Sequence, residues 1–304
     1  MPDLHPHPRA AEALRHPLRH RLAERGIDWS LLLLLPAVAV IAGLFLYPFI
    51  YGVTISFQPL EGGDAFANYR DFFGDSYLAG SIVKTLRLAV PVAGVSVGLA
   101  APIAYQCRRD FRGRRLVTLV LMLPITFGSI LIAQGMLRVF SPYGWVNLAL
   151  KGLGLPQGSF LYDYQGTFVA AVLTTLPLAF LLLMGFFGGI DPALENAAAT
   201  LGASRATRFW KIVLPLAMPG ILTALMLALV EAFAIFPSAI LVGQPDNQTH
   251  VLTIPIYQAA SQRSDYTQAS AIAIVLTAME LLILGLTVVI RNRLYKGPAL
   301  GGKG

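Results

Sequence analysis

Charged residues are scarce in this chain of 304 residues: Asp, Glu, Lys and Arg make up 13% of it, whereas apolar and aromatic residues make up 56%. An ordinary soluble domain carries about 25% charged residues. This chain has more apolar surface than a single water-facing fold can enclose around one core. The scarcity of charge therefore excludes a typical soluble globule and indicates a protein whose natural solvent is the lipid bilayer.

Residue types that commonly carry enzyme chemistry are also few. Cys107 is the single cysteine, which excludes an intramolecular disulfide. Four of the five histidines lie in the first 20 residues, so a metal site among the apolar segments would lack imidazole ligands. The string from Gly297 to Gly304 approaches a phosphate-binding loop but lacks the Ser or Thr that would bind magnesium. We therefore predict no catalytic residue, no metal and no cofactor in this chain.

Long uncharged stretches define the fold class. Five intervals of 19 or more residues contain no charged side chain, and a sixth, Ser270 to Ile290, is interrupted only by Glu280. A helix of about 20 residues crosses the ~30 Å hydrocarbon core, and backbone groups in lipid must pair within their own segment. We predict an all-α integral membrane protein with six transmembrane helices, at residues 30–53, 82–106, 115–139, 165–189, 215–241 and 268–290.

The basic residues indicate how the chain is oriented. Of the 23 Lys and Arg residues, 17 lie in the tail 1–28, in the segments 106–115 and 190–211, or after residue 290. By the positive-inside rule these parts are cytoplasmic, so both termini are expected on the cytoplasmic side of a bacterial inner membrane. We divide the chain into an N-terminal tail (1–28), a membrane domain (29–291) and a C-terminal tail (292–304). The net charge of +7 is interpreted as a topology signal rather than as a nucleic-acid surface.

The cytoplasmic segment 191–213 has strong local structure signals. Asp191 followed by Pro192 is typical of a helix N-terminus, and Gly202 suits the left-handed residue that ends a helix. Ser204 can cap a second helix that leads into the fifth span. On these residues alone, the segment is either a protein-docking projection or an amphipathic helix held on lipid headgroups by Arg205, Arg208 and Lys211.

The same segment carries a family resemblance. Asn196-Ala197-Ala198-Ala199-Thr200-Leu201-Gly202, then nine residues, then Ile212-Val213-Leu214-Pro215, resembles the "EAA" signature of permease subunits of binding-protein-dependent ABC importers with the type I fold. One position departs from the pattern: the family's Glu aligns with Asn196, and Glu195 lies one residue earlier. A single step along a helix turns a side chain by about 100°, so whether Glu195 replaces the missing carboxylate stays open.

The resemblance implies a division of labour between subunits. In such importers the loop is a coupling helix that docks on an ATPase, and the ATPase binds ATP and magnesium. The expected partners are a second permease subunit, different from this one, two ATPase subunits, an external solute-binding protein and membrane lipid, with no nucleic acid. The candidate coupling residues are Glu195, Asn196, Ala197, Ala198, Leu201, Gly202, Phe209, Ile212, Leu214 and Pro215.

The sequence identifies the substrate less closely than it identifies the class of transporter. Phe236-Pro237-Ser238-Ala239 and Asp265-Tyr266 look closest to the polyamine, opine and phosphonate branch of the family, which includes spermidine and putrescine permeases. Polyamine or aminophosphonate is therefore the expected substrate, with a sugar or glycerol phosphate as the alternative. A transporter driven by an ion gradient is the rival from another class.

Two carboxylates lie within apolar spans. Glu231 and Glu280 would each cost at least about 2.5–3.5 kcal/mol if charged at the bilayer centre, so each is expected to face the bundle interior, a cavity or a partner. Both are candidates for a substrate pathway that takes cations. For Glu280 an interhelical hydrogen bond is the favoured interpretation. Two glycine pairs, Gly94 with Gly98 and Gly185 with Gly189, are predicted to allow close helix packing.

Overall fold

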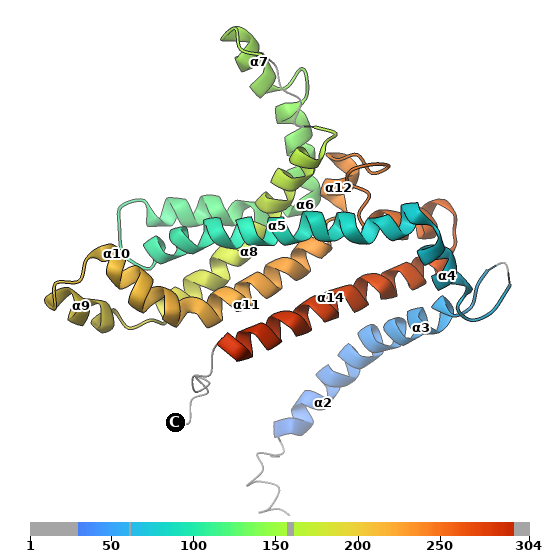
Figure 1. The fold of residues 1–304 in the computed structure, drawn as a ribbon, viewed down its shortest axis with the longest axis horizontal. Helices are drawn as coiled ribbons and strands as arrows, with labels where there is room; N and C mark the ends of the chain where they lie inside the picture. Colours follow the sequence, from blue (N-terminus) through green and yellow to red (C-terminus); the bar gives the residue numbers. More distant parts are fainter. Residues whose placement is uncertain (1–29, 61, 157–160, 295–304) are drawn as a thin grey trace, which may run out of the picture. The chain divides into compact units, whose positions relative to one another are not determined.

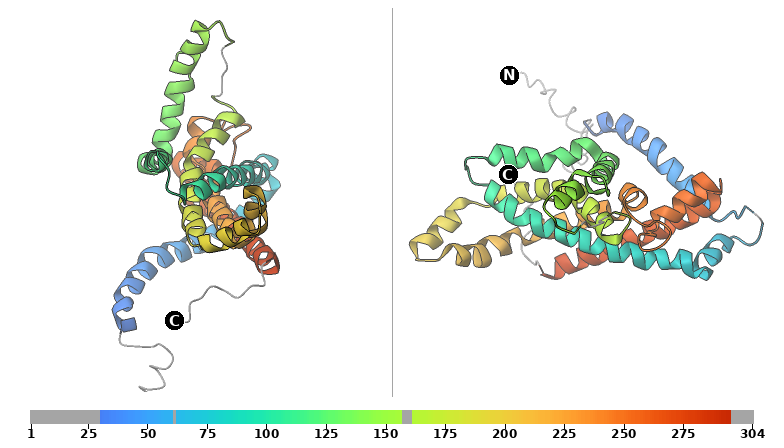
Figure 2. Two further views of the ribbon diagram at one scale, coloured as in Figure 1. Left: turned by 90° about the vertical axis from the view of Figure 1, so that its left-hand side faces the viewer. Right: turned by 90° about the horizontal axis from the view of Figure 1, so that it is seen from above.

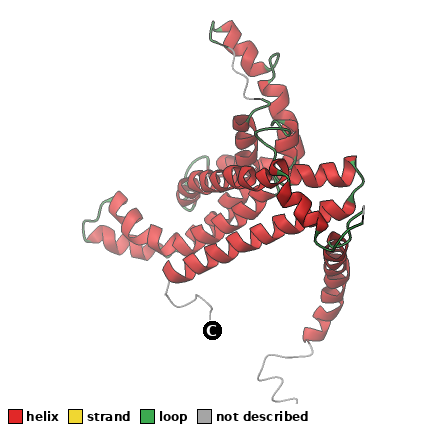
Figure 3. Cartoon of the chain, turned by 45° about the vertical axis from the view of Figure 1, so that its right-hand side comes forward, coloured by secondary structure: helices red, strands yellow, loops and turns green. Residues whose placement is uncertain are grey.

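The computed structural model describes residues 30–60, 62–156 and 161–294, and these residues form helices joined by loops, with no strand among them (Figure 3). Six helical stretches in this part of the chain are long and apolar enough to cross a membrane: Leu34–Ser56, Ser76–Cys107, Arg114–Gly152, Tyr164–Gly188, Arg205–Phe233 and Tyr266–Arg293. The predicted all-α class and its six spans are confirmed. The predicted N-terminal tail (1–28) lies outside the described residues, and so do residues 295–304 of the predicted C-terminal tail.

The chain divides into two compact units, residues 1–54 and 55–304. The described part of the first unit contains α2 (Ser30–Ile41), the π-helical turn η1 (Ala42–Leu46) and most of α3 (Tyr47–Ser56). Side chains 34–51 of this unit are all exposed, although they are almost entirely apolar. Apolar surface of this extent is stable only when lipid or another protein covers it.

Three long helices form the centre of the second unit. The helices α5 (Ser76–Cys107), α8 (Tyr164–Gly188) and α11 (Leu214–Phe233) pack on one another (Figures 1 and 2). Their core contains fully buried Phe180, Phe187 and Phe233 together with buried alanines. Alanine allows the helix backbones to approach closely, which stabilises helix packing in a membrane.

The remaining long helices flank this centre. The helix α6 (Arg114–Phe140) packs on α8, and α14 (Tyr266–Leu294) packs on α11 and on the short helix α4 (Ala67–Gly74). Inside α6, Gly128 has φ 69° and ψ 166°, which interrupts the helical backbone. A positive φ of this kind is accessible to glycine at little cost. The second half of α6 then leads to α7 (Trp145–Gly152) (Figure 1).

Two predicted helix boundaries are wrong, each for an identifiable reason. The second span begins at Ser76 rather than at residue 82, because the Asp75 carboxylate accepts a hydrogen bond from the backbone N–H of Tyr77 at 2.8 Å and starts the helix earlier. The fifth span ends at Phe233 rather than at residue 241. Pro237 lacks an N–H, and in a helix its ring would collide with the carbonyl four residues earlier, which belongs to Phe233. Pro237 instead begins the short helix α12 (Pro237–Leu241).

The long loops after the third span and before the last contain short helices. The helix α7 lies in the loop after the third span, and α13 (Thr253–Tyr257) with the π-helical turn η3 (Gln258–Gln262) lies in the loop before the last. A backbone hydrogen bond joins the two loops, because the N–H of Tyr162 donates to the carbonyl of Val242 at 2.6 Å. These two loops therefore contain short helices and contact each other, and are not simple connections between the spans.

The glycine prediction is wrong within this chain. A Cβ atom added at Gly94, Gly98 or Gly185 would meet no heavy atom within 4 Å, and one at Gly189 would meet only backbone of its own helix end. The close approach lies instead at Gly220 on α11, where an added Cβ would overlap the Cβ and Cγ atoms of Phe186 on α8. Sequence spacing identified glycines on helices, but only the packing shows which of them a neighbouring helix touches.

Candidate functional site: the cytoplasmic loop and its anchor

The predicted cytoplasmic loop is a capped pair of helices. The helix α9 (Pro192–Thr200) begins where the Asp191 carboxylate accepts from the N–H of Ala193 at 2.8 Å. It ends at Thr200, and Gly202 follows two residues later with a left-handed φ of +81°. The helix α10 (Arg205–Arg208) then starts where the Ser204 hydroxyl accepts from the N–H of Thr207 at 3.2 Å. Both caps and the left-handed glycine are confirmed.

The second helix of the loop is continuous with a membrane span. The π-helical turn η2 (Phe209–Val213) follows α10 directly and passes into α11 without a break (Figure 1). Val213 is fully buried, and Phe209 packs on the ring of Tyr105 with centroids 5.0 Å apart. The helix α10 is thus connected rigidly to the fifth span through η2.

The candidate coupling residues separate into three groups by exposure. Leu201 is 88% exposed, a high value for a large apolar side chain. It lies among other exposed members of the motif: Asn196, Ala197, Gly202 and Pro215. Half-buried members are Ala198, Phe209, Ile212 and Leu214. Only Glu195 is buried, with 3% exposure.

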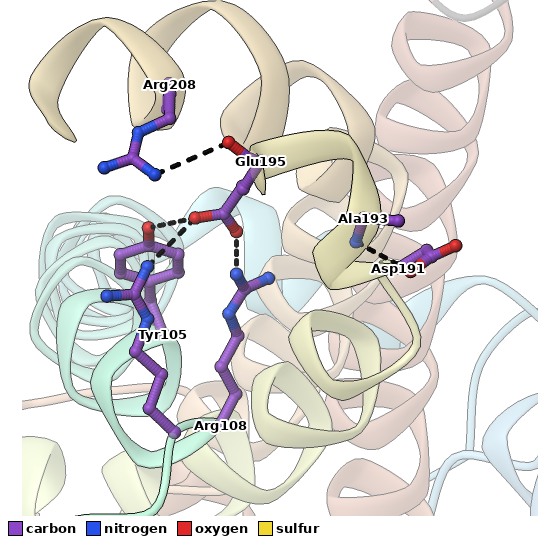
Figure 4. Close-up of polar contacts among 7 residues, drawn as sticks. Tyr105, Arg108, Asp191, Ala193, Glu195 and Arg208 are labelled. Atoms are coloured by element: carbon purple, nitrogen blue, oxygen red, sulfur yellow. Dashed lines mark hydrogen bonds and ion pairs between the residues drawn. The ribbon is translucent and has the colours of Figure 1, made fainter. Parts of the chain in front are cut away.

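Glu195 points into the protein rather than out from it (Figure 4). Its carboxylate forms an ion pair with Arg108, whose side chain is 7% exposed, and a second ion pair with Arg109 at 3.0 Å. The Tyr105 hydroxyl donates to the same carboxylate at 3.2 Å, and an N–H of Arg208 donates to the backbone carbonyl of Glu195 at 3.4 Å. Glu195 is therefore a contact between α9 and the C-terminal end of α5, and it does not belong to the exposed face of the motif.

The partners of Glu195 were not predicted as site residues. The sequence pattern assigns no role to Tyr105, and Arg108 and Arg109 enter only as basic residues that indicate orientation. A carboxylate in an otherwise apolar loop helix needs a cation when it is buried. A pair of arginines at the end of the adjacent span was the signal that could have identified its partners.

The two membrane carboxylates lie on different helices and in different environments. Glu231 is exposed, on the last turn of α11 before the break at Ala234. Glu280 is half-buried on α14. In the described part of the chain, neither side chain forms a hydrogen bond or an ion pair, so the interhelical hydrogen bond expected for Glu280 is absent there. The exposed position of Glu231 agrees with a surface that faces a pathway or a partner.

A serine-hydrolase spacing also occurs in the chain and has no catalytic geometry. Residues 94–98 read Gly-Val-Ser-Val-Gly, but they lie inside α5, and Ser96 is fully buried. The nucleophile of that motif requires a sharp turn between a strand and a helix that exposes its hydroxyl. The helical setting of Ser96 does not provide one.

Six helices long and apolar enough to cross a membrane, with a capped helix pair between the fourth and the fifth, define a polytopic membrane protein. Residues 91–297 match the family described as the binding-protein-dependent transport system inner membrane component. The chain belongs to this family and is a permease subunit of an ABC importer.

Curated relatives carry more specific names. The chain is 30% identical over 271 residues to the sn-glycerol-3-phosphate transport system permease protein UgpA of Yersinia pseudotuberculosis, covering 85% of this chain and 91% of that protein. It is 25% identical to a probable ABC transporter permease of Brucella abortus, covering 86% and 96%. It is 26% identical to the ferric transport permease FbpB of Actinobacillus pleuropneumoniae, covering 82% and 36%.

The fold also occurs in a solved transporter. A chain of a bacterial alginate ABC transporter, in complex with an alginate-bound periplasmic protein, superposes with a TM-score of 0.76, covering 92% of this chain and 99% of that chain. The sequence identity is 23%, so this likeness shows the fold alone. None of the relatives described above is named for polyamine transport, and the resemblance to that branch gains no support from them.

Proposed function

We propose that this chain forms half of a translocation pathway and that α9 is the helix through which ATPase subunits drive it. The observation that carries the proposal is the exposed, capped face of α9. Asn196, Ala197 and Leu201 face outward there, although Leu201 gains nothing from contact with water. An apolar side chain presented at the tip of a rigid projection favours a protein partner that covers it.

The lipid-anchored alternative fits the geometry less well. An interfacial helix requires one continuous apolar face, whereas the nine-residue helix α9 has small or polar side chains at most of its exposed positions. Trp210 is 65% exposed and lies on η2, close to the membrane span. Trp210 suits the headgroup region, and α9 suits a proteinaceous groove.

The proposed assembly contains a second permease subunit, two ATPase subunits and an external solute-binding protein. ATP and magnesium are bound by the ATPase partners, and this chain supplies no catalytic group. The family description, which specifies binding-protein-dependent transport, supports the need for the external protein. The exposed apolar side chains of α2, α3 and α6 support a further membrane partner in addition to lipid.

A crosslinking experiment tests the coupling role. Ala197→Cys, on the exposed face of α9, is expected to crosslink to the cognate ATPase subunit in the assembled complex. Gln262→Cys, exposed on η3 in the external loop, is the matched control and is expected to give no such product. Labelling of Ala197→Cys by a lipid-soluble probe, without an ATPase adduct, would contradict the proposal.

For the substrate we propose a small cation or a cation-bearing solute, of which a polyamine is the leading example. The support is Glu231, a carboxylate left exposed near the end of α11 at a break in the helix. Aminophosphonate, which carries an amine, fits the same reasoning. The name of the ferric relative is consistent with a cationic cargo.

A second substrate class has its own support. The relative at 30% identity is named for sn-glycerol-3-phosphate, which favours a phosphorylated or sugar-like solute. The two classes differ in charge, and the cognate solute-binding protein separates them directly. Calorimetric titration of that protein with spermidine and with glycerol-3-phosphate decides between them. Uptake into proteoliposomes that requires both ATP and the binding protein excludes a transporter driven by an ion gradient.

A further inference from the structure

The carboxylate of Glu195 connects three elements at the cytoplasmic end of the bundle (Figure 4). It lies on α9, its side-chain partners Tyr105, Arg108 and Arg109 lie at the end of α5, and Arg208 of α10 reaches its backbone carbonyl. The guanidinium groups of Arg108 and Arg109 also lie over the ring of Tyr105, at 4.9 and 5.7 Å from its centroid. The contacts thus form a compact cluster with the carboxylate at its centre.

Two of the three connections between α9 and the membrane helices are covalent. The chain enters α9 from α8 through Gly189 and Ile190, and it leaves toward α11 through α10 and η2. The connection to α5 has no covalent component and depends on the Glu195 cluster. Because α5 also packs on both α8 and α11, it is one of the three central helices of the second unit.

We propose that Glu195 is a positioning residue that fixes α9 to α5, so that a displacement of α9 moves α5 with it. This inference rests on the proposed coupling function. The aromatic contacts of Tyr105 with Phe187 of α8 and Phe209 of η2, at 5.8 and 5.0 Å between centroids, link the same point to the other two helices. A displacement of α9 is then transmitted to three membrane helices together: α5, α8 and α11.

Burial gives this connection its stiffness. A carboxylate with 3% exposure beside a guanidinium with 7% exposure has little water to replace either partner. Separating the two would leave each charge desolvated and unpaired, which is strongly unfavourable. By contrast, the pair Asp110–Arg114, between the end of α5 and the start of α6, is exposed, with 96% exposure of the carboxylate. An exposed pair separates at little cost.

The test uses the whole transporter, reconstituted with its partner permease, ATPase subunits and binding protein. Glu195→Gln removes the charge at nearly constant volume. We expect the ATPase subunits to remain bound and to hydrolyse ATP, while the number of solutes taken up per ATP falls about tenfold, a typical size for coupling between sites. Arg109→Gln, at the half-exposed edge of the cluster, is expected to give a smaller decrease in the same ratio without a folding defect.

A distance measurement gives a readout that a purely structural role would not change. Spin labels at Ala199 on α9 and Gln106 on α5, both exposed, are expected to report one distance that is the same with and without ATP. In Glu195→Gln the distribution is expected to broaden and to shift on ATP binding. Asp110→Asn is the control and is expected to leave both the distance and the uptake ratio unchanged.

Each outcome decides the inference. An unchanged uptake ratio in both Glu195→Gln and Arg109→Gln would overturn it, as would an α9–α5 distance that already changes with ATP in the unsubstituted transporter. If the Glu195→Gln transporter does not assemble, the inference is still tested by the uptake ratio of Arg109→Gln and by the α9–α5 distance in the unsubstituted transporter. Failure of the unsubstituted complex to show ATP-dependent uptake would instead contradict the proposed function itself.

Discussion

At the scale of single residues, Glu231 separates the two substrate classes. Its carboxylate is exposed on α11, and in the described residues it has no ion-pair partner that would give it a purely structural role. Glu231→Gln is expected to lower uptake of a cationic solute about tenfold, because a lost charge contact of ~1.4 kcal/mol corresponds to that factor. The measurement is initial uptake rate in proteoliposomes, with copurification of the partner subunits as the control. Unchanged uptake would refute the assignment.

His250 is a second residue whose chemistry follows from its surroundings. Its side chain is fully buried in the external loop, its ring lies 4.0 Å from that of Tyr77, and Nδ1 lies 2.8 Å from the carbonyl of Pro245. Burial lowers the pKa of His250 below its ordinary value of 6.5, the Pro245 carbonyl raises it, and Lys84 lowers it. Asp246 and Asp75 act in the opposite direction to Lys84. Burial is the largest of these effects, so the folded state favours the neutral ring.

The stability of the external loop is therefore expected to depend on pH. The unfolded chain binds the proton at a higher pH than the folded chain, so stability is full above pH 6.5 and decreases as the pH falls below it. Thermal unfolding of the purified complex at pH 7.5 and 5.5 measures the effect. His250→Phe retains a ring beside Tyr77 and is expected to reduce the difference between the two pH values. An equal difference in both proteins would show that His250 is not responsible.

At the scale of helices, α8 and α11 approach each other closely at Gly220. Gly220→Ala is expected to lower the free energy of unfolding by about 1–3 kcal/mol, because the new methyl group overlaps Phe186 near its backbone. Gly285→Ala on α14 is the matched control, since its Cβ meets nothing within 4 Å; it should be neutral or stabilising. Thermal unfolding in detergent measures both. Recovery of stability in Gly220→Ala combined with Phe186→Ala would identify the clash as the cause.

The helices were predictable from sequence where they depend only on local features, namely an uncharged stretch long enough to cross lipid or a capping residue. Uncharged stretches located six spans, and local caps located α9, because both depend on residues that are neighbours in the chain. The end of α11 depended on the proline at 237, a local signal that the uncharged interval concealed. The Glu195 cluster was signalled only by the arginines at the end of the second span. Its pairing was not predicted, because it joins residues 86 to 90 positions apart through burial that only the packed bundle creates.

At the scale of the whole molecule, the orientation in the membrane stays a prediction. Single cysteines at Ser204 and Asn247, both exposed, are expected to lie on opposite sides. In spheroplasts, a membrane-impermeant maleimide should label Asn247→Cys directly and Ser204→Cys only after lysis, because basic segments stay on the cytoplasmic side. The natural Cys107 is 1% exposed, and Cys107→Ala removes any residual background. The reverse pattern of labelling would contradict the orientation.

The surface of the isolated chain also indicates that the subunit is incomplete alone. Apolar side chains are exposed along α6, including Ile125, Phe127 and Ile130 around the break at Gly128. Irregular backbone at membrane depth is tolerated only where protein covers it or where it lines a water-filled cavity. This part of α6 is therefore expected to be covered by the second permease subunit rather than by lipid.

Because α10, η2 and α11 are continuous, the nine-residue interval of the motif sets the position of the loop around the axis of the fifth span. Each residue added to or removed from a helix turns everything beyond it by about 100° around the helix axis. A chain that kept every motif letter but lost Ala206 or Thr207 from α10 would present Arg205 on a different side of α11, whereas a residue lost within η2 can be absorbed by a return to α-helix. The interval thus sets the phase between the cytoplasmic loop and the membrane span, and counting letters alone would miss such a change.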